Sequence, residues 1–154
     1  MEYTKRSNPD RGYMKLDVWQ KAVELYPLVH EVMMKAKIEY KLRAQIEDST
    51  QSVSSNIAEG YSCRSIKEYI QHLYVSLGSL SETLSRAITF TAAGQISGQD
   101  FERIDILHYE VENKLWSLVG SLQKMQDEGT WSDRVFEEMA EYNADDESNN
   151  PPIQ

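Results

Sequence analysis

The stretch SIKEYIQHLYVSLGSLSETLSRAITFTAAG, residues 65–94, decides the fold class. Apolar or small side chains recur along it at alternating spacings of four and three residues, at Ile66, Ile70, Leu73, Leu77, Leu80, Leu84, Ala87 and Thr91. A heptad pattern of this length is typical of a helix that packs in a coiled-coil-like bundle. Ser65 and Glu68 form an S-x-x-E capping box that predicts the helix start, and Gly94 predicts its end.

Similar stripes of apolar side chains, here called seams, occur in the segments before and after this stretch. The first helix is expected after Asp17 as its cap, with a kink but no stop near Tyr26, because Pro27 lacks an N–H donor. A second helix follows the narrow apolar face Leu42, Ile46, Ser49, Val53 and Ile57. We expect Gly60 just after it, in the left-handed conformation that ends helices. A fourth helix is capped by Ser97, follows a seam over residues 101–125 and ends at Gly129.

These signals predict an all-α protein, an antiparallel up-down-up-down four-helix bundle over residues 16–128. Glycine (7) and proline (4) are scarce, and no segment alternates as a strand would. Residues 1–15 are expected to form a flexible N-terminal arm. Residues 129–154 are expected to hold a short amphipathic segment, 131–142, and a disordered acidic C-terminal tail.

Charge and composition narrow the function classes. The net charge is −9, of which residues 131–154 carry −6, so the remaining body is close to neutral. This balance does not favour a generic polyanion binder, although a basic patch is compatible with it. The single cysteine excludes an intramolecular disulfide and a cysteine zinc cluster. With no apolar run of membrane length and no signal-peptide pattern, we expect a cytoplasmic protein.

The residues that could carry chemistry are isolated. Asp105 and His108 have the D-x-x-H spacing of a metal pair without a matching second pair, so His108 is expected to be a hydrogen-bonded core histidine. Glu68 and His72 lie one helical turn apart, which is common on solvated faces. Cys63 precedes a helix N-terminus, which can lower a thiol pKa, but no base is evident beside it. We expect a protein that is not an enzyme and holds no metal or cofactor.

Large side chains also flank the four seams, at Trp19, Tyr26, Met33, Tyr69, Tyr74, Ile106, Tyr109 and Trp116. One interpretation is that they widen the core of a monomer. The other is self-association, because aromatic residues are enriched where proteins meet. The interface candidates are Trp19, Tyr26, Tyr109 and Trp116, with Trp116 the best single candidate.

Polar residues gather around the expected turn in SVSSNIAEGYSCR, residues 52–64. Asn56 and Glu59 are three residues apart on one helical face, Gly60 is expected to supply the turn, and Arg64 follows it. Arg64 could pair with Glu59 or meet open carbonyls at the helix end. Together they form either a structural clasp between the second and third helices or a binding surface.

Four motifs carry a resemblance to a known family: LDVWQKAVEL (16–25), Gln45-Ile46, SVSSNIAEG (52–60) followed by Arg64, and LGSLSE (77–82). Over about residues 16–127 the chain resembles the four-helix bundle proteins named after the intervening sequences of large-subunit ribosomal RNA. It is more distantly similar to the accessory variability determinant of diversity-generating retroelements. The resemblance implies a homo-oligomer, typically a pentameric ring, without catalysis. It also implies partners such as structured RNA or a reverse transcriptase.

The chain departs from the family pattern where a pair of arginines often follows the Gln-Ile motif, because Glu47 and Asp48 stand there. Two acids repel phosphate, so protein–protein contacts are favoured and an accessory or adaptor protein is expected. RNA binding is the alternative. Its candidate contacts are the cations Lys5, Arg6, Arg11, Lys15, Arg64, Lys67, Arg86 and Lys114.

Overall fold

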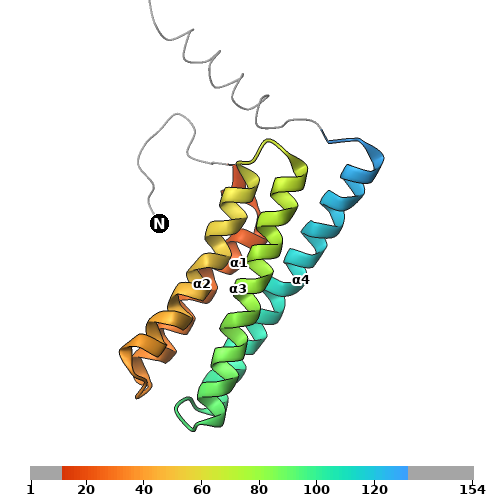
Figure 1. Cartoon of the computed structure of the whole chain (residues 1–154). Helices are drawn as coiled ribbons and strands as arrows, with labels where there is room; N and C mark the ends of the chain where they lie inside the picture. Colours follow the sequence, from red (N-terminus) through yellow and green to blue (C-terminus); the bar gives the residue numbers. More distant parts are fainter. Residues whose placement is uncertain (1–11, 132–154) are drawn as a thin grey trace, which may run out of the picture.

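The computed structural model describes residues 12–131, which form a short 3-10 turn and four long helices (Figure 1). The turn, η1, spans Gly12–Lys15, and the helices are α1 (Asp17–Lys35), α2 (Tyr40–Tyr61), α3 (Ile66–Ala92) and α4 (Gly98–Glu128). Successive helices run in opposite directions, and the described range contains no strand. The predicted all-α four-helix bundle is therefore confirmed.

Most predicted helix ends are present, but the cap predicted for α1 is wrong and the one predicted for α3 lacks its hydrogen bond. Gly94 and Gly129 have φ angles of 72° and 65° and end α3 and α4 as predicted. Ser97 caps α4, where its hydroxyl accepts a hydrogen bond from the backbone N–H of Asp100. The side chain of Ser65, however, makes no capping hydrogen bond. Asp17 is the first residue of α1 and not its cap, because its carboxylate is paired with Lys114 on α4.

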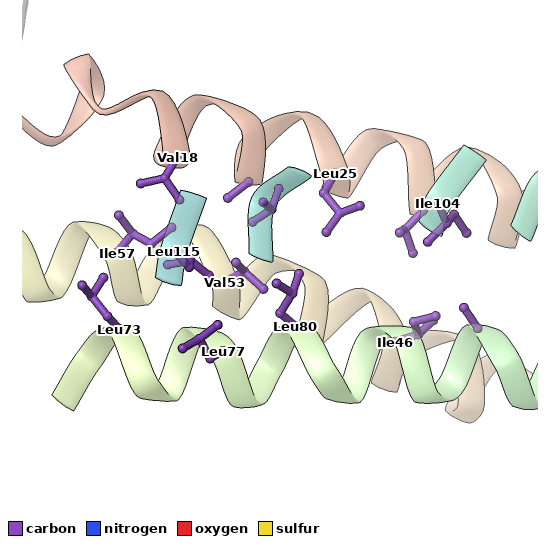
Figure 2. Close-up of a cluster of buried hydrophobic side chains, with 14 of the residues drawn as sticks. Val18, Leu25, Ile46, Val53, Ile57, Leu73, Leu77, Leu80, Ile104 and Leu115 are labelled. Atoms are coloured by element: carbon purple, nitrogen blue, oxygen red, sulfur yellow. The ribbon is translucent and has the colours of Figure 1, made fainter. Parts of the chain in front are cut away.

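The core runs along the bundle axis and receives side chains from all four helices (Figure 2). Leu25, Ile46, Leu73, Ile104 and Leu115 are fully buried. α1 continues through Pro27 as predicted, with the proline ring exposed to solvent. No helix of residues 12–131 is long and apolar enough to cross a membrane.

The buried face of α3 is rotated from the predicted seam toward α2. Ile66, Leu84 and Thr91 are only half-buried, whereas a second stripe with a period of seven is buried, at Tyr69, Ser76, Thr83 and Phe90. Hydroxyl groups join this stripe to α2, since Ser76 Oγ donates to the Val53 carbonyl at 2.8 Å. Ser49 Oγ also lies 3.0 Å from Thr83 Oγ1. The small side chains of α2 thus let it pack closely on α3.

The first and the last residues of the described range make aromatic contacts at the same end of the bundle. Residues 12–15, expected in the flexible arm, instead pack on the bundle, where the Tyr13 ring lies 5.3 Å from Trp19 and 6.5 Å from Tyr61. Trp131, the first residue of the predicted amphipathic segment, lies 6.3 Å from Tyr69. The rest of that segment, the acidic tail and residues 1–11 lie outside the described residues.

Candidate interaction surfaces

The connection between α2 and α3 brings Asn56 and Glu59 to one histidine of α3. Asn56 Nδ2 donates to the Ser52 carbonyl at 2.9 Å, and Asn56 Oδ1 lies 3.2 Å from His72 Nδ1. Glu59 Oε2 lies 3.7 Å from the same nitrogen. His72 therefore links the two helices, a role that its spacing from Glu68 in the sequence did not indicate.

Gly60 corrects a prediction made from the sequence. It lies inside α2 with an ordinary helical backbone, because positive φ among the described glycines occurs only at Gly94 and Gly129. A Cβ atom at Gly60 would stand 2.7 Å from Tyr69 Cδ2 and 2.9 Å from His72 Cβ. Such distances are far inside van der Waals contact. Gly60 is thus required for the close approach of α3 and not for a left-handed turn.

Two of the residues that the sequence placed around this turn, Glu59 and Arg64, face solvent. The Glu59 side chain is 65% exposed, and Arg64 is exposed in the turn before α3. Ion pairs between exposed groups contribute little to stability. The contacts expected of a clasp are therefore made by Asn56, Gly60 and His72, while Glu59 and Arg64 form its outer rim.

Cys63 has the properties of an unreactive thiol. Its Sγ donates to the Glu59 carbonyl at 3.4 Å. Burial raises the pKa of the thiol, and the nearby Glu68 and Glu59 carboxylates raise it further. The following helix N-terminus does not lower this pKa as the sequence allowed, so the nucleophilic thiolate is disfavoured.

His108 is a core histidine, as predicted. It is 2% exposed, and its Nε2 hydrogen-bonds the Leu80 carbonyl at 2.9 Å. Asp105, its partner in the D-x-x-H spacing, is exposed. Within residues 12–131 no three His, Cys, Asp or Glu side chains gather as metal ligands.

An exposed and uncharged surface, here named the α3–α4 face, extends along the last two helices. Its members on α3 are Tyr74, Gly78, Ser81, Ser85, Ile88 and Ala92, and those on α4 are Ile106, Tyr109, Asn113, Trp116, Gly120 and Gln123. Both sets follow the alternating spacing of a heptad seam. The two stripes adjoin, because the Tyr74 ring packs edge-on against Trp116 at 6.0 Å and its hydroxyl accepts a hydrogen bond from Gln123.

The large side chains that flank the four seams in the sequence are thus divided between the core and the surface. Met33 and Tyr69 are buried and widen the core. Tyr109 and Trp116, two of the four interface candidates, are 63% and 51% exposed on the α3–α4 face.

The other two interface candidates are half-buried on α1. Trp19 packs against Tyr13, and Tyr26 stacks on His30 at 6.0 Å. These contacts place Trp19 and Tyr26 apart from the α3–α4 face.

Two of the cations predicted as RNA contacts are engaged by partners within the described bundle. Lys114 is paired with Asp17, and Arg86 bridges Glu82 and Gln45. Lys15, Arg64 and Lys67 are exposed, whereas Lys5, Arg6 and Arg11 lie outside the described residues. Of the two acids that replace the family arginines, Glu47 pairs with His30 at 2.7 Å and Asp48 is exposed.

Comparison with known proteins agrees with this architecture. Residues 14–117 match the sequence model of the 23S rRNA-intervening sequence protein. A crystal structure of a protein of unknown function from the S23 ribosomal protein family of Bacteroides thetaiotaomicron is similar with a TM-score of 0.63. The two chains are 22% identical over 66% of this chain and 97% of the other, a likeness that shows the shared fold. No curated protein matches the chain. Since the family match spans more than half of its residues, the chain belongs to the 23S rRNA-intervening sequence protein family.

Proposed function

We propose that this protein is a non-catalytic, homo-oligomeric helical bundle that acts as an accessory or adaptor protein through protein–protein contacts. The observation that carries the proposal is the α3–α4 face, which repeats the spacing of a core seam on the outside of the bundle. Large aromatic and aliphatic side chains exposed on one uncharged face are typical of interaction sites, and this face exposes Tyr74, Ile88, Ile106, Tyr109 and Trp116. The family resemblance suggests five copies in a ring.

The composition of the face suits helix-to-helix contact. At Gly78 and Gly120 the space beyond the backbone is open, so a neighbouring helix can approach closely. On the same face, Tyr109 and Trp116 can act as anchors, because aromatic side chains dominate the energetics of interfaces. Covering the exposed half of one such ring removes on the order of 100 Å² of surface from water, worth about 2–3 kcal/mol.

The non-catalytic part of the proposal rests on the state of the reactive side chains. The Cys63 thiol has a raised pKa, and His108 is buried against a helical carbonyl. Neither group is presented to a substrate in the described bundle.

Native mass spectrometry and light scattering of the full chain test the self-association. We expect an assembly for the wild type and smaller species for Tyr109→Glu and Trp116→Glu, with helical content unchanged by circular dichroism. Tyr40→Glu is the matched control, since Tyr40 is also exposed but lies on α2, outside the α3–α4 face. A wild type that stays monomeric at tens of micromolar, or face variants that assemble normally, would refute the proposal. A stoichiometry other than five would correct only the pentamer.

A further inference from the structure

The turn between α1 and α2 carries a separate surface, the basic tip, made of Lys37, Tyr40, Lys41 and Arg43 (orange in Figure 1). Residues 36–43 hold three cations and one acid, a net charge of +2. Residues 12–131 as a whole carry −4. Positive charge is therefore concentrated at this end of an otherwise acidic bundle.

The cations of the tip differ from most others in the described bundle. Lys21, Lys35, Arg86, Arg103 and Lys114 are each paired with an acid. Lys37, Lys41 and Arg43 have no acidic partner among residues 12–131, and both lysines are exposed. Cations that are not neutralised within the protein can still neutralise the charge of a ligand.

An aromatic ring stands among these cations. Tyr40 is 74% exposed, the largest exposed fraction of any large hydrophobic residue described. The Arg43 guanidinium carbon lies 5.6 Å from the centroid of the ring, a cation–π contact that orients it. With so little of the ring covered, a planar group can stack on it.

Contacts with the rest of the bundle fix the backbone of the basic tip. Ile38 is buried, and the Lys37 carbonyl accepts a hydrogen bond of 3.4 Å from Gln95 in the α3–α4 connection. Tyr40 itself is the first residue of α2. The cations and the ring are thus presented on a fixed backbone, which reduces the entropy lost on binding.

We infer that the basic tip binds a single-stranded stretch of nucleic acid, with one base stacked on Tyr40 and the flanking phosphates contacted by Lys37, Lys41 and Arg43. An exposed aromatic ring between unpaired cations is the combination that single-strand binding uses, because every base has a face to stack and every nucleotide has a phosphate. An acidic peptide would need the cations but not the ring. The inference is independent of the α3–α4 face, although self-association would repeat the tip and strengthen binding by avidity.

Fluorescence anisotropy of labelled twelve-nucleotide oligo-U and oligo-dT with the full chain at low salt tests this site. We expect Tyr40→Ala to weaken binding by roughly 5- to 100-fold and Tyr40→Phe to keep it, because stacking needs the ring and not the hydroxyl. The double variant Lys37→Ala/Lys41→Ala should lower the slope of log affinity against log salt by about 1.4, which corresponds to about 0.7 per phosphate contact on a single strand. Lys21→Ala/Lys124→Ala removes the same charge elsewhere, at two lysines that are paired with Glu24 and Glu128, and should bind like the wild type.

Three results would overturn the inference. These are no binding of either oligonucleotide by the wild type, tip variants that bind normally, and displacement by polyglutamate as effective as by unlabelled oligonucleotide. The last result would assign the tip to an acidic protein. A preference for either oligonucleotide supports the site. Tighter binding of oligo-U would identify RNA as the ligand, and tighter binding of oligo-dT would identify DNA.

Discussion

Replacing Gly60 by alanine tests how the bundle closes between α2 and α3. The added methyl group would lie 2.7 Å from Tyr69 Cδ2, 2.9 Å from His72 Cβ and 3.2 Å from the Tyr69 carbonyl oxygen. The Tyr69 ring can turn slightly, but His72 Cβ and the carbonyl oxygen are fixed to the backbone of α3. The two helices therefore have to separate by several tenths of an ångström.

Two opposing terms set the size of the effect. Overpacking a well-packed site costs about 1–3 kcal/mol. Replacing glycine by alanine at an unstrained helical position stabilises the folded state by about 0.4–1 kcal/mol, because it reduces the conformational entropy of the unfolded chain. We expect a net loss of about 1–2 kcal/mol in the free energy of unfolding, seen as a fall in Tm of about 3–8 °C for a chain of this size.

Thermal and urea unfolding followed by circular dichroism measure this change. Gly98→Ala is the matched control, because Gly98 is helical with no positive φ and has no atom within 4 Å of the added Cβ. Its stability should stay equal or rise by up to about 1 kcal/mol. Gly60→Asn separates the two explanations for the glycine, since asparagine suits a left-handed position but is larger than alanine. A Gly60→Ala protein as stable as the wild type, or an asparagine variant better than the alanine one, would refute the close-approach reasoning.

Three further predictions concern single side chains. The pKa of Glu31 is lowered from 4.5 to about 2, chiefly by its hydrogen bonds with Arg103, so its stabilising effect is present above its unfolded pKa and lost as pH falls from about 4.5 to 2. The Tm advantage of the wild type over Glu31→Gln should shrink across that range, and an advantage that persists at pH 2 would contradict the pairing. His108→Ala should cost about 2–4 kcal/mol in unfolding experiments because it leaves a core cavity, and neither zinc nor a chelator should shift the Tm of the wild type. A metal-dependent shift would instead reveal a metal site. Burial and neighbouring acids raise the pKa of Cys63, so iodoacetamide should label it more slowly at pH 8 in the native protein than in urea, as followed by mass spectrometry. Equal labelling rates would show an open and unperturbed thiol.

The helices could be predicted from the sequence because their signals are local. The seam of residues 65–94 and the glycines that end α3 and α4 are read from spacing along one chain. His108 was also predicted correctly, since it stands on the heptad seam of α4, which is buried in the bundle. The cap predicted at Asp17 failed because α1 begins after Leu16 and the Asp17 carboxylate pairs with Lys114. Ser65 precedes α3 as predicted, but its side chain makes no capping hydrogen bond.

The candidate sites were harder to predict because they depend on pairs of helices. Tyr40 and its neighbouring cations match no motif in the sequence. Only the exposure of the Tyr40 ring and the absence of acidic partners for the cations within the described bundle indicate a site. Trp116 was singled out in the sequence as the best interface candidate and is exposed, while its role in an interface stays a prediction. That it shares one uncharged face with Tyr74 followed only from the packing of α3 on α4.

The sequence by itself determined that this chain is a four-helix bundle, where α3 and α4 end and which family it belongs to, because periodicity, end signals and motifs are properties of neighbours along the chain. Only the tertiary structure decided why Gly60 must be glycine, which stripe of α3 is buried and which faces stay open. A helix of period 3.6 presents several possible faces to its surroundings, and the rotation that each adopts is set by the shapes of the helices packed against it.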